Sequence, residues 1–182
     1  RVIGRYAEEA DVLLEAESLA EALGEPGRLV ELMSRRGVAL SIIGRASAGA
    51  PLLDRALASA RADKNRLGEA VALGNQGIAA ERIGDFPRSI ALHEEQIRIC
   101  VAEGARRAEA IACGNASAAL LGSGRVQAGI DMNVRCIRIA RELGDVGVEV
   151  LAHGNLGWAL SMLGRHEEAC VENLRQLELA RA

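Results

Sequence analysis

Apolar residues recur at steps of three and four along residues 67–83, where they define one face of an amphipathic helix. The members of this face are Ala70, Leu73, Gly77, Ala80 and Ile83. Gly84 predicts the end of the helix, because glycine readily adopts the left-handed conformation of a helix C-terminus. Pro87 suits the first turn of a second helix, where its missing N–H costs nothing. The apolar stripe of that second helix consists of Ile90, Ile97 and Val101.

This pattern of two helices repeats every 40 residues. The columns at this spacing include Gly44, Gly84, Gly124 and Gly164; Gly37, Gly77, Ser117 and Gly157; Asn75, Asn115 and Asn155; and Leu57, Ile97, Ile137 and Leu177. Because a fixed period indicates an array of one supersecondary unit, we predict a single all-α solenoid of about four to five repeats over residues 1–182. Its predicted helix pairs are 27–64, 67–104, 107–144 and 147–182, preceded by a trailing second helix at 4–24.

The first complete pair departs from the repeat at two positions. Arg35 stands where the other units have asparagine, and Pro51 lies deeper in its helix than Pro87 does. An interior proline removes a hydrogen bond and clashes with the preceding turn. We therefore expect this helix to start late, after a loop at 45–49.

The amino-acid composition favours a helical protein and argues against nucleic-acid binding and membrane spanning. Hydrophobic residues make up 49% of the chain but aromatic residues only 2%, which predicts closely packed helices with a core of Ala, Leu, Ile and Val. The net charge of −3 argues against a nucleic-acid partner. The longest uncharged stretch, 110–124, is too short and too polar to span a membrane. The four cysteines lack metal-binding spacing, which indicates reduced thiols and a cytoplasmic location.

A family resemblance follows from two segments. The sequence GNQGIAAERIGDFPRSIALHEEQIRI (Gly74–Ile99), echoed by GNLGWALSMLGRHEEACVENLRQLEL (Gly154–Leu179), resembles the tetratricopeptide repeat. At 40 residues the unit resembles the longer variant found in spindle-orientation adaptors and in bacterial regulatory proteins. The resemblance implies a right-handed α-α superhelix whose first helices line a concave groove for a partner.

The resemblance also implies which residues face the groove. The asparagines Asn75, Asn115 and Asn155 are expected to hydrogen-bond the backbone of an extended peptide, or alternatively to hold neighbouring helices at the repeat angle. Trp158 is either a groove anchor or a packing residue against the adjacent second helix. The remaining expected groove residues are Arg35, Val71, Ile78, Glu81, Arg82, Ile111, Ala118, Leu151 and Ser161. Only Arg35 and Arg82 could belong to a clamp for a peptide carboxylate.

The sequence contains few candidate catalytic or metal-binding residues. The triplets at 93–95 and 166–168 resemble the start of a zinc-protease HExxH motif, but both lack the second histidine. We interpret His93 as a residue that packs between helices. His153 and Cys113 share a column and could approach each other, yet a metal would need more ligands. The sequence therefore predicts no enzyme, no catalytic or metal-binding residues and no cofactor.

The sequence predicts a scaffold that captures a protein or peptide segment in its groove, with neither nucleic acid nor membrane as partner. Because the chain begins with Arg1 rather than Met, we expect a fragment of a larger protein, as the sensor or regulatory module of a bacterial signalling protein. The alternative is a structural solenoid that forms a homo-oligomer through its uncapped terminal helices. End-face residues such as Leu174 and Leu177 would then carry the contact.

Overall fold

The computed structural model describes the backbone of residues 2–181 and the side chains of residues 4–181. These residues form α-helices joined by short turns, without a strand among them. The helices are α1 (Val2–Ala22), α2 (Pro26–Ile42), α3 (Ala46–Ala62), α4 (Arg66–Arg82), α5 (Phe86–Ala102), α6 (Arg106–Gly122), α7 (Val126–Leu143), α8 (Val146–Met162) and α9 (His166–Arg181). The predicted all-α class is confirmed.

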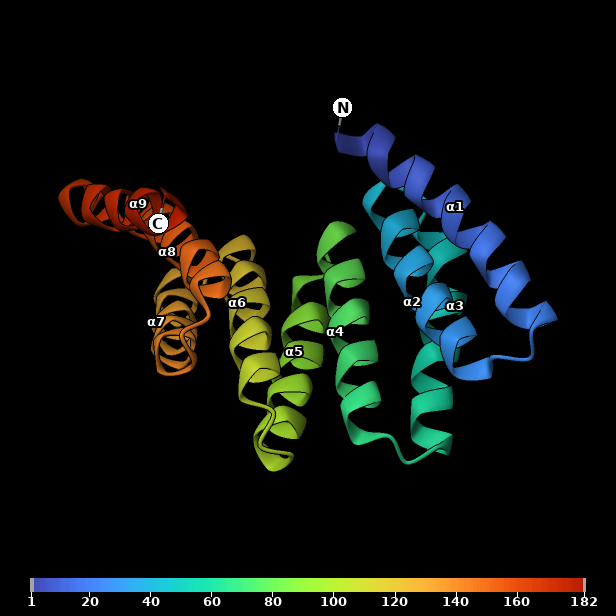
Figure 1. The fold of residues 1–182 in the computed structure, drawn as a ribbon. Helices are drawn as coiled ribbons and strands as arrows, with labels where there is room; N and C mark the ends of the chain where they lie inside the picture. Colours follow the sequence, from blue (N-terminus) through green and yellow to red (C-terminus); the bar gives the residue numbers. More distant parts are fainter. Residues whose placement is uncertain (1, 182) are drawn as a thin grey trace. The chain divides into compact units, whose positions relative to one another are not determined.

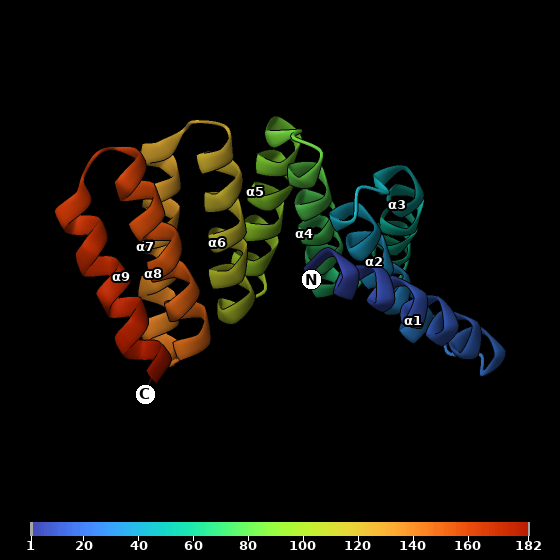
Figure 2. The ribbon, with the colours of Figure 1, turned by 90° about the horizontal axis from the view of Figure 1, so that it is seen from above.

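The chain divides into two compact units, residues 1–92 (unit 1) and residues 93–182 (unit 2). In unit 1, α1, α2, α3 and α4 pack in sequence, and α2 also contacts α4 (Figure 1). In unit 2, α6, α7, α8 and α9 pack in the same manner, with α6 against α8 (Figure 2). The boundary between the units falls within α5. We call α2, α4, α6 and α8 the first helices.

Gly84 ends α4, as the sequence predicted. Its φ angle is 80°, and Gly24 and Gly144 have positive φ angles of 69° and 67° at other turns between helices, a conformation that a residue without a Cβ adopts at little cost. Pro87 lies at the second position of α5, also as predicted. Two residues of the predicted apolar stripes are exposed, however. Ile83 and Val101 lie at the C-terminal ends of α4 and α5, beyond the packed turns.

The expected loop at 45–49 is wrong, because α3 begins at Ala46 and contains Pro51. The Arg45 carbonyl accepts hydrogen bonds from the N–H groups of Ala48 and Gly49, so a helical turn forms before the proline. Pro51 removes only the bond to the carbonyl four residues earlier, which is in that first turn. Packing against α2 also holds this turn in place. A Cβ on Gly49 would lie only 2.5 Å from the Gly37 carbonyl oxygen.

Small and aliphatic side chains form the cores. The largest cluster of unit 2 consists of Ala, Leu, Ile, Val and Cys residues from α5 to α9, in agreement with the low aromatic content. His93 is fully buried, as its interpretation as a packing residue requires. Its Nδ1 lies 3.1 Å from Gln96 Oε1, and burial lowers the pKa of His93 despite that contact. None of the helices described is long and apolar enough to cross a membrane.

Candidate functional site

The asparagine column has one member with a defined structural contact. Asn75, on α4, donates from Nδ2 to the Ser34 hydroxyl on α2 over 2.7 Å. Ser34 is buried, so this bond ties two successive first helices together, as the structural alternative for this column requires. Asn115 on α6 and Asn155 on α8 are half-buried. Their amides therefore keep surface that a partner can reach.

Three predicted groove residues, Arg35, Val71 and Asn75, line one cavity in unit 1. It has a volume of about 590 Å³ and lies between α2, α3 and α4; we call it the unit 1 cavity. It is open because several of its wall positions carry small residues. These are Gly27, Ala56, Ala60, Gly68 and Ala72. A volume of this size falls in the range of ligand-binding clefts.

The other expected residues of α4 do not line this cavity. Ile78 and Glu81 are half-buried and Arg82 is exposed. Burial raises the pKa of Glu81, and the neighbouring Arg82 only partly offsets that effect. Arg35 reaches away from α4 toward α1, where its guanidinium lies 3.2 Å from Glu9 Oε1. Arg35 on α2 therefore already has a carboxylate partner, and Arg82 lies on a different first helix, α4.

In unit 2 the expected residues lie along α6 and α8. Ile111 is 38% exposed, Leu151 68% and Trp158 53%. Ala118 is half-buried, and Ser161 is exposed. An exposed Trp is an unusual use of the largest apolar side chain in a chain with only one. These helices therefore present an apolar face that no other described element covers.

A column of buried glutamates was missed by the sequence reasoning. Glu69, Glu109 and Glu149 are 40 residues apart and each is more than nine-tenths buried. Each pairs with an arginine of an adjacent second helix, for example Arg135 Nη2 with Glu109 Oε1 at 2.6 Å. Burial raises the pKa of Glu109, but hydrogen bonds and charges from Arg135 and Arg106 outweigh it and leave that pKa below its usual value. The 40-residue spacing was the signal that could have identified them.

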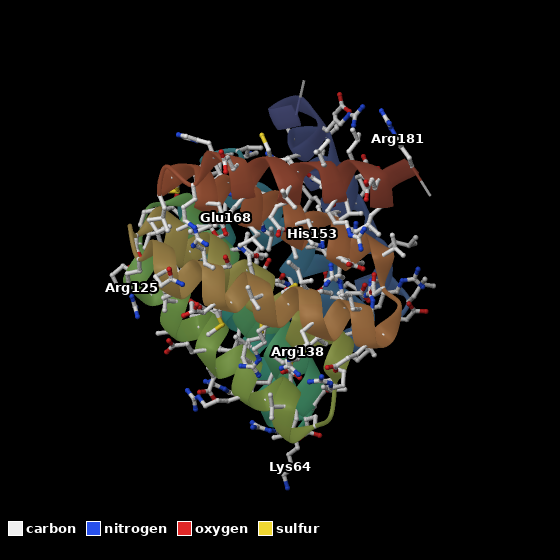
Figure 3. The ribbon with its side chains drawn as sticks, turned by 90° about the vertical axis from the view of Figure 1, so that its left-hand side faces the viewer. Lys64, Arg125, Arg138, His153, Glu168 and Arg181 are labelled. Carbon is white, nitrogen blue, oxygen red and sulfur yellow. The ribbon has the colours of Figure 1, made fainter. Side chains whose placement is uncertain are left out.

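His153 belongs to a polar network in unit 2 (Figure 3). Its Nδ1 lies 2.5 Å from Glu172 Oε2 on α9, and its Nε2 lies 3.1 Å from the Arg141 guanidinium on α7. Arg141 also donates to Glu149 over 2.6 Å. Next to this network is an open cavity of about 450 Å³. Both ring nitrogens of His153 therefore have partners that hold α7, α8 and α9 together.

Among the described residues the potential metal ligands are dispersed, and three of the four cysteines are buried. No three His, Cys, Asp or Glu side chains in this part of the chain converge as a metal site would require. Burial raises the pKa of Cys113 to about 12 and that of Cys136 to about 11, so neither thiol is an effective nucleophile at neutral pH. The first helices carry exposed apolar side chains, among them Val71, Ile111, Leu151 and Trp158.

The helix order and these exposed faces define a TPR-like helical repeat fold. The solved structure of MamA 41-end from Desulfovibrio magneticus RS-1, a TPR-like helical repeat protein, covers 95% of this chain and 96% of its own, with a TM-score of 0.62 and 18% identity. The MamA RS-1 ArsTM double mutant covers 95% of both chains, with a TM-score of 0.61 and 19% identity. No family model and no curated protein matches the sequence.

Proposed function

We propose that this chain is a tetratricopeptide-type scaffold that captures segments of a partner protein on the faces of its first helices. The observation that carries the proposal is a column of exposed aliphatic residues. Val71 is 57% exposed, Ile111 38% and Leu151 68%. These residues are 40 apart, so successive first helices expose an apolar side chain at the same position.

An aliphatic side chain in water gives up the free energy it would gain on burial, about 25 cal/mol per Å² of apolar area. Solenoid folds use such faces as extended binding surfaces. Within unit 2, a partner segment with apolar residues at matching intervals would cover Ile111, Leu151 and Trp158. Asn115 and Asn155 would contribute hydrogen bonds to its backbone. In unit 1, Val71 offers a separate exposed aliphatic contact.

We further propose that the scaffold is the regulatory module of a larger bacterial signalling protein, with the 40-residue variant of the repeat as its unit. A cytoplasmic location is part of the proposal, supported by four cysteines that are all free.

Selection from a displayed random-peptide library tests the proposal. The native chain is compared with a Val71→Ser/Ile111→Ser/Leu151→Ser variant. A matched control, Val12→Ser/Leu19→Ser/Val134→Ser, removes exposed aliphatic residues of α1 and α7 instead. We expect the native chain and the control to enrich the same peptides and the first-helix variant to lose them. Equal enrichment on all three proteins, or none on any, would contradict the proposal.

Self-association is the second candidate function, and α9 favours it. Val171, Leu174 and Leu177 are all exposed on this helix, and a second copy could cover such a row. A library selection without enrichment, together with a mass that rises with protein concentration, would support this alternative.

A further inference from the structure

The unit 1 cavity differs in charge from the other first-helix positions. Val71, Ile111 and Leu151 are aliphatic, but the first member of the same column is Glu31. Glu31 lines the cavity, and so does Asp63 at the end of α3. Two carboxylates therefore line this cavity beside glycine, alanine and valine residues. The other lining residues are Ser34, Arg35, Ser59, Asn65 and Asn75.

The cations near this cavity are already paired with other carboxylates. The pairs are Arg28 with Glu25, Arg35 with Glu9, and both Arg61 and Arg66 with Glu69. Lys64 extends away from the ribbon (Figure 3). Within the described residues, Glu31 and Asp63 have no ion-pair partner. The cavity therefore has an excess of negative charge that the chain itself does not neutralise.

The position of Asp63 does not favour stability. Asp63 is the C-cap residue of α3, where the helix dipole presents partial negative charge. A carboxylate there is repelled by the last carbonyl groups of the helix. The one side-chain hydrogen bond to Asp63 among the described residues is a long one, from the Ser59 hydroxyl to Asp63 Oδ2 over 3.5 Å, so the charge is left without an opposite partner.

Resting on the function proposed above, we propose that the unit 1 cavity binds an arginine or lysine side chain of the partner segment. The methylene groups of that side chain would lie against Val30, Ala56, Ala60 and Ala72, and its charged end would face Glu31 and Asp63. Long basic side chains bury their stems in this manner while their charge stays near water or a counter-ion. Unit 1 thus selects a basic residue and the aliphatic column selects apolar ones.

An NMR titration of the full chain tests this assignment with three probes. These are Nα-acetyl-arginine methylamide, its neutral citrulline analogue and its norleucine analogue, each followed through backbone amide shifts at low salt. The variant is Glu31→Gln/Asp63→Asn. The control, Glu94→Gln/Glu103→Gln, removes the same charge from exposed sites on α5 and at its C-terminal end.

We expect saturable shifts at residues 27–35 and 59–75 with the arginine probe only. The variant should bind this probe about ten-fold more weakly, because charge-assisted contacts are lost, and the control should bind like the native chain. Equal binding of the citrulline or norleucine probe, no localised shifts, or unaltered binding by the variant would overturn the assignment. The proposed function would fail by a different outcome, namely a library selection in which no enriched peptide depends on the first-helix residues.

Discussion

Lys64 adopts the backbone conformation that glycine adopts at the other inter-helix turns. Its φ is 54°, whereas Gly24, Gly104 and Gly144 at the corresponding positions have φ between 66° and 69°. A residue with a Cβ pays roughly 1–2 kcal/mol in the left-handed region. Replacing lysine by glycine would remove this cost. Glycine has more freedom in the unfolded chain, however, and this offsets about 0.5–1 kcal/mol of the gain.

We therefore expect Lys64→Gly to raise the free energy of unfolding by about 0.5–1 kcal/mol. Urea denaturation followed by circular dichroism measures this change. Gly144→Lys, the reverse exchange at an equivalent turn, should lower stability by a similar amount. A Lys64→Gly protein less stable than the native chain would show that the lysine side chain makes a contact outweighing the strain.

At the scale of the helical elements, close approach of α2 and α3 depends on two glycines. A Cβ on Gly49 would meet the Gly37 carbonyl oxygen at 2.5 Å, and the backbone cannot give way as a side chain can. A Cβ on Gly114 of α6 would meet only Cys136 Sγ, at an ordinary 3.7 Å. The same substitution should therefore have opposite effects at these two helical positions.

Gly49→Ala should lower the free energy of unfolding by about 1–3 kcal/mol, as overpacking does. Gly114→Ala should raise it by up to about 1 kcal/mol, because alanine is the better helix former. Differential scanning calorimetry of both variants measures the two signs. A neutral Gly49→Ala would mean that α2 and α3 are less tightly packed than the structure has them.

Glu109 connects α6 to α7 through Arg135, and it also pairs with Arg106 on α6. Because the pKa of Glu109 lies below its unfolded value, its ionised form stabilises the fold. This contribution is fully present above the unfolded carboxyl pKa near 4.5. It is lost as the pH falls through the lower pKa of the folded state.

Glu109→Gln should therefore lower stability by about 1–3 kcal/mol at pH 7, as expected when a charged hydrogen-bonding partner is removed. The difference from the native protein should shrink below the unfolded pKa and vanish in stronger acid. Urea denaturation at a series of pH values from neutral to acid measures it. Exposed Glu94→Gln serves as the control. A difference that stays constant at all pH values would contradict the assigned ionisation.

Some helix boundaries could be predicted from the sequence and others could not. Turns at Gly84 and Gly144 follow from local chemistry, because glycine favours the left-handed C-terminal position regardless of distant contacts. The start of α3 could not be predicted from local chemistry, because Gly49 packs against Gly37, a residue twelve positions earlier. Tertiary packing there overrides the local cost of Pro51.

At the scale of the whole molecule, the repeat period predicted the fold class but only part of the candidate site. The exposed column at Val71, Ile111 and Leu151 follows from the 40-residue register. The unit 1 cavity does not follow from this register, because small residues of three different helices line it together. Asn75 resembles its column partners in sequence, yet its bond to Ser34 depends on the hydroxyl that α2 places opposite it.

Capture by the first-helix faces is tested most directly by the affinity of the most strongly enriched peptide for the native chain and the two serine variants. Trp158 reports on binding, because it is the only Trp and its indole is half exposed on α8. We expect a saturable blue shift of Trp158 emission when the peptide binds. The dissociation constant should be at least about ten-fold larger for the first-helix variant Val71→Ser/Ile111→Ser/Leu151→Ser. It should be unchanged for the control Val12→Ser/Leu19→Ser/Val134→Ser. Equal affinities for all three proteins, with no change in Trp158 emission, would contradict capture by the first-helix faces.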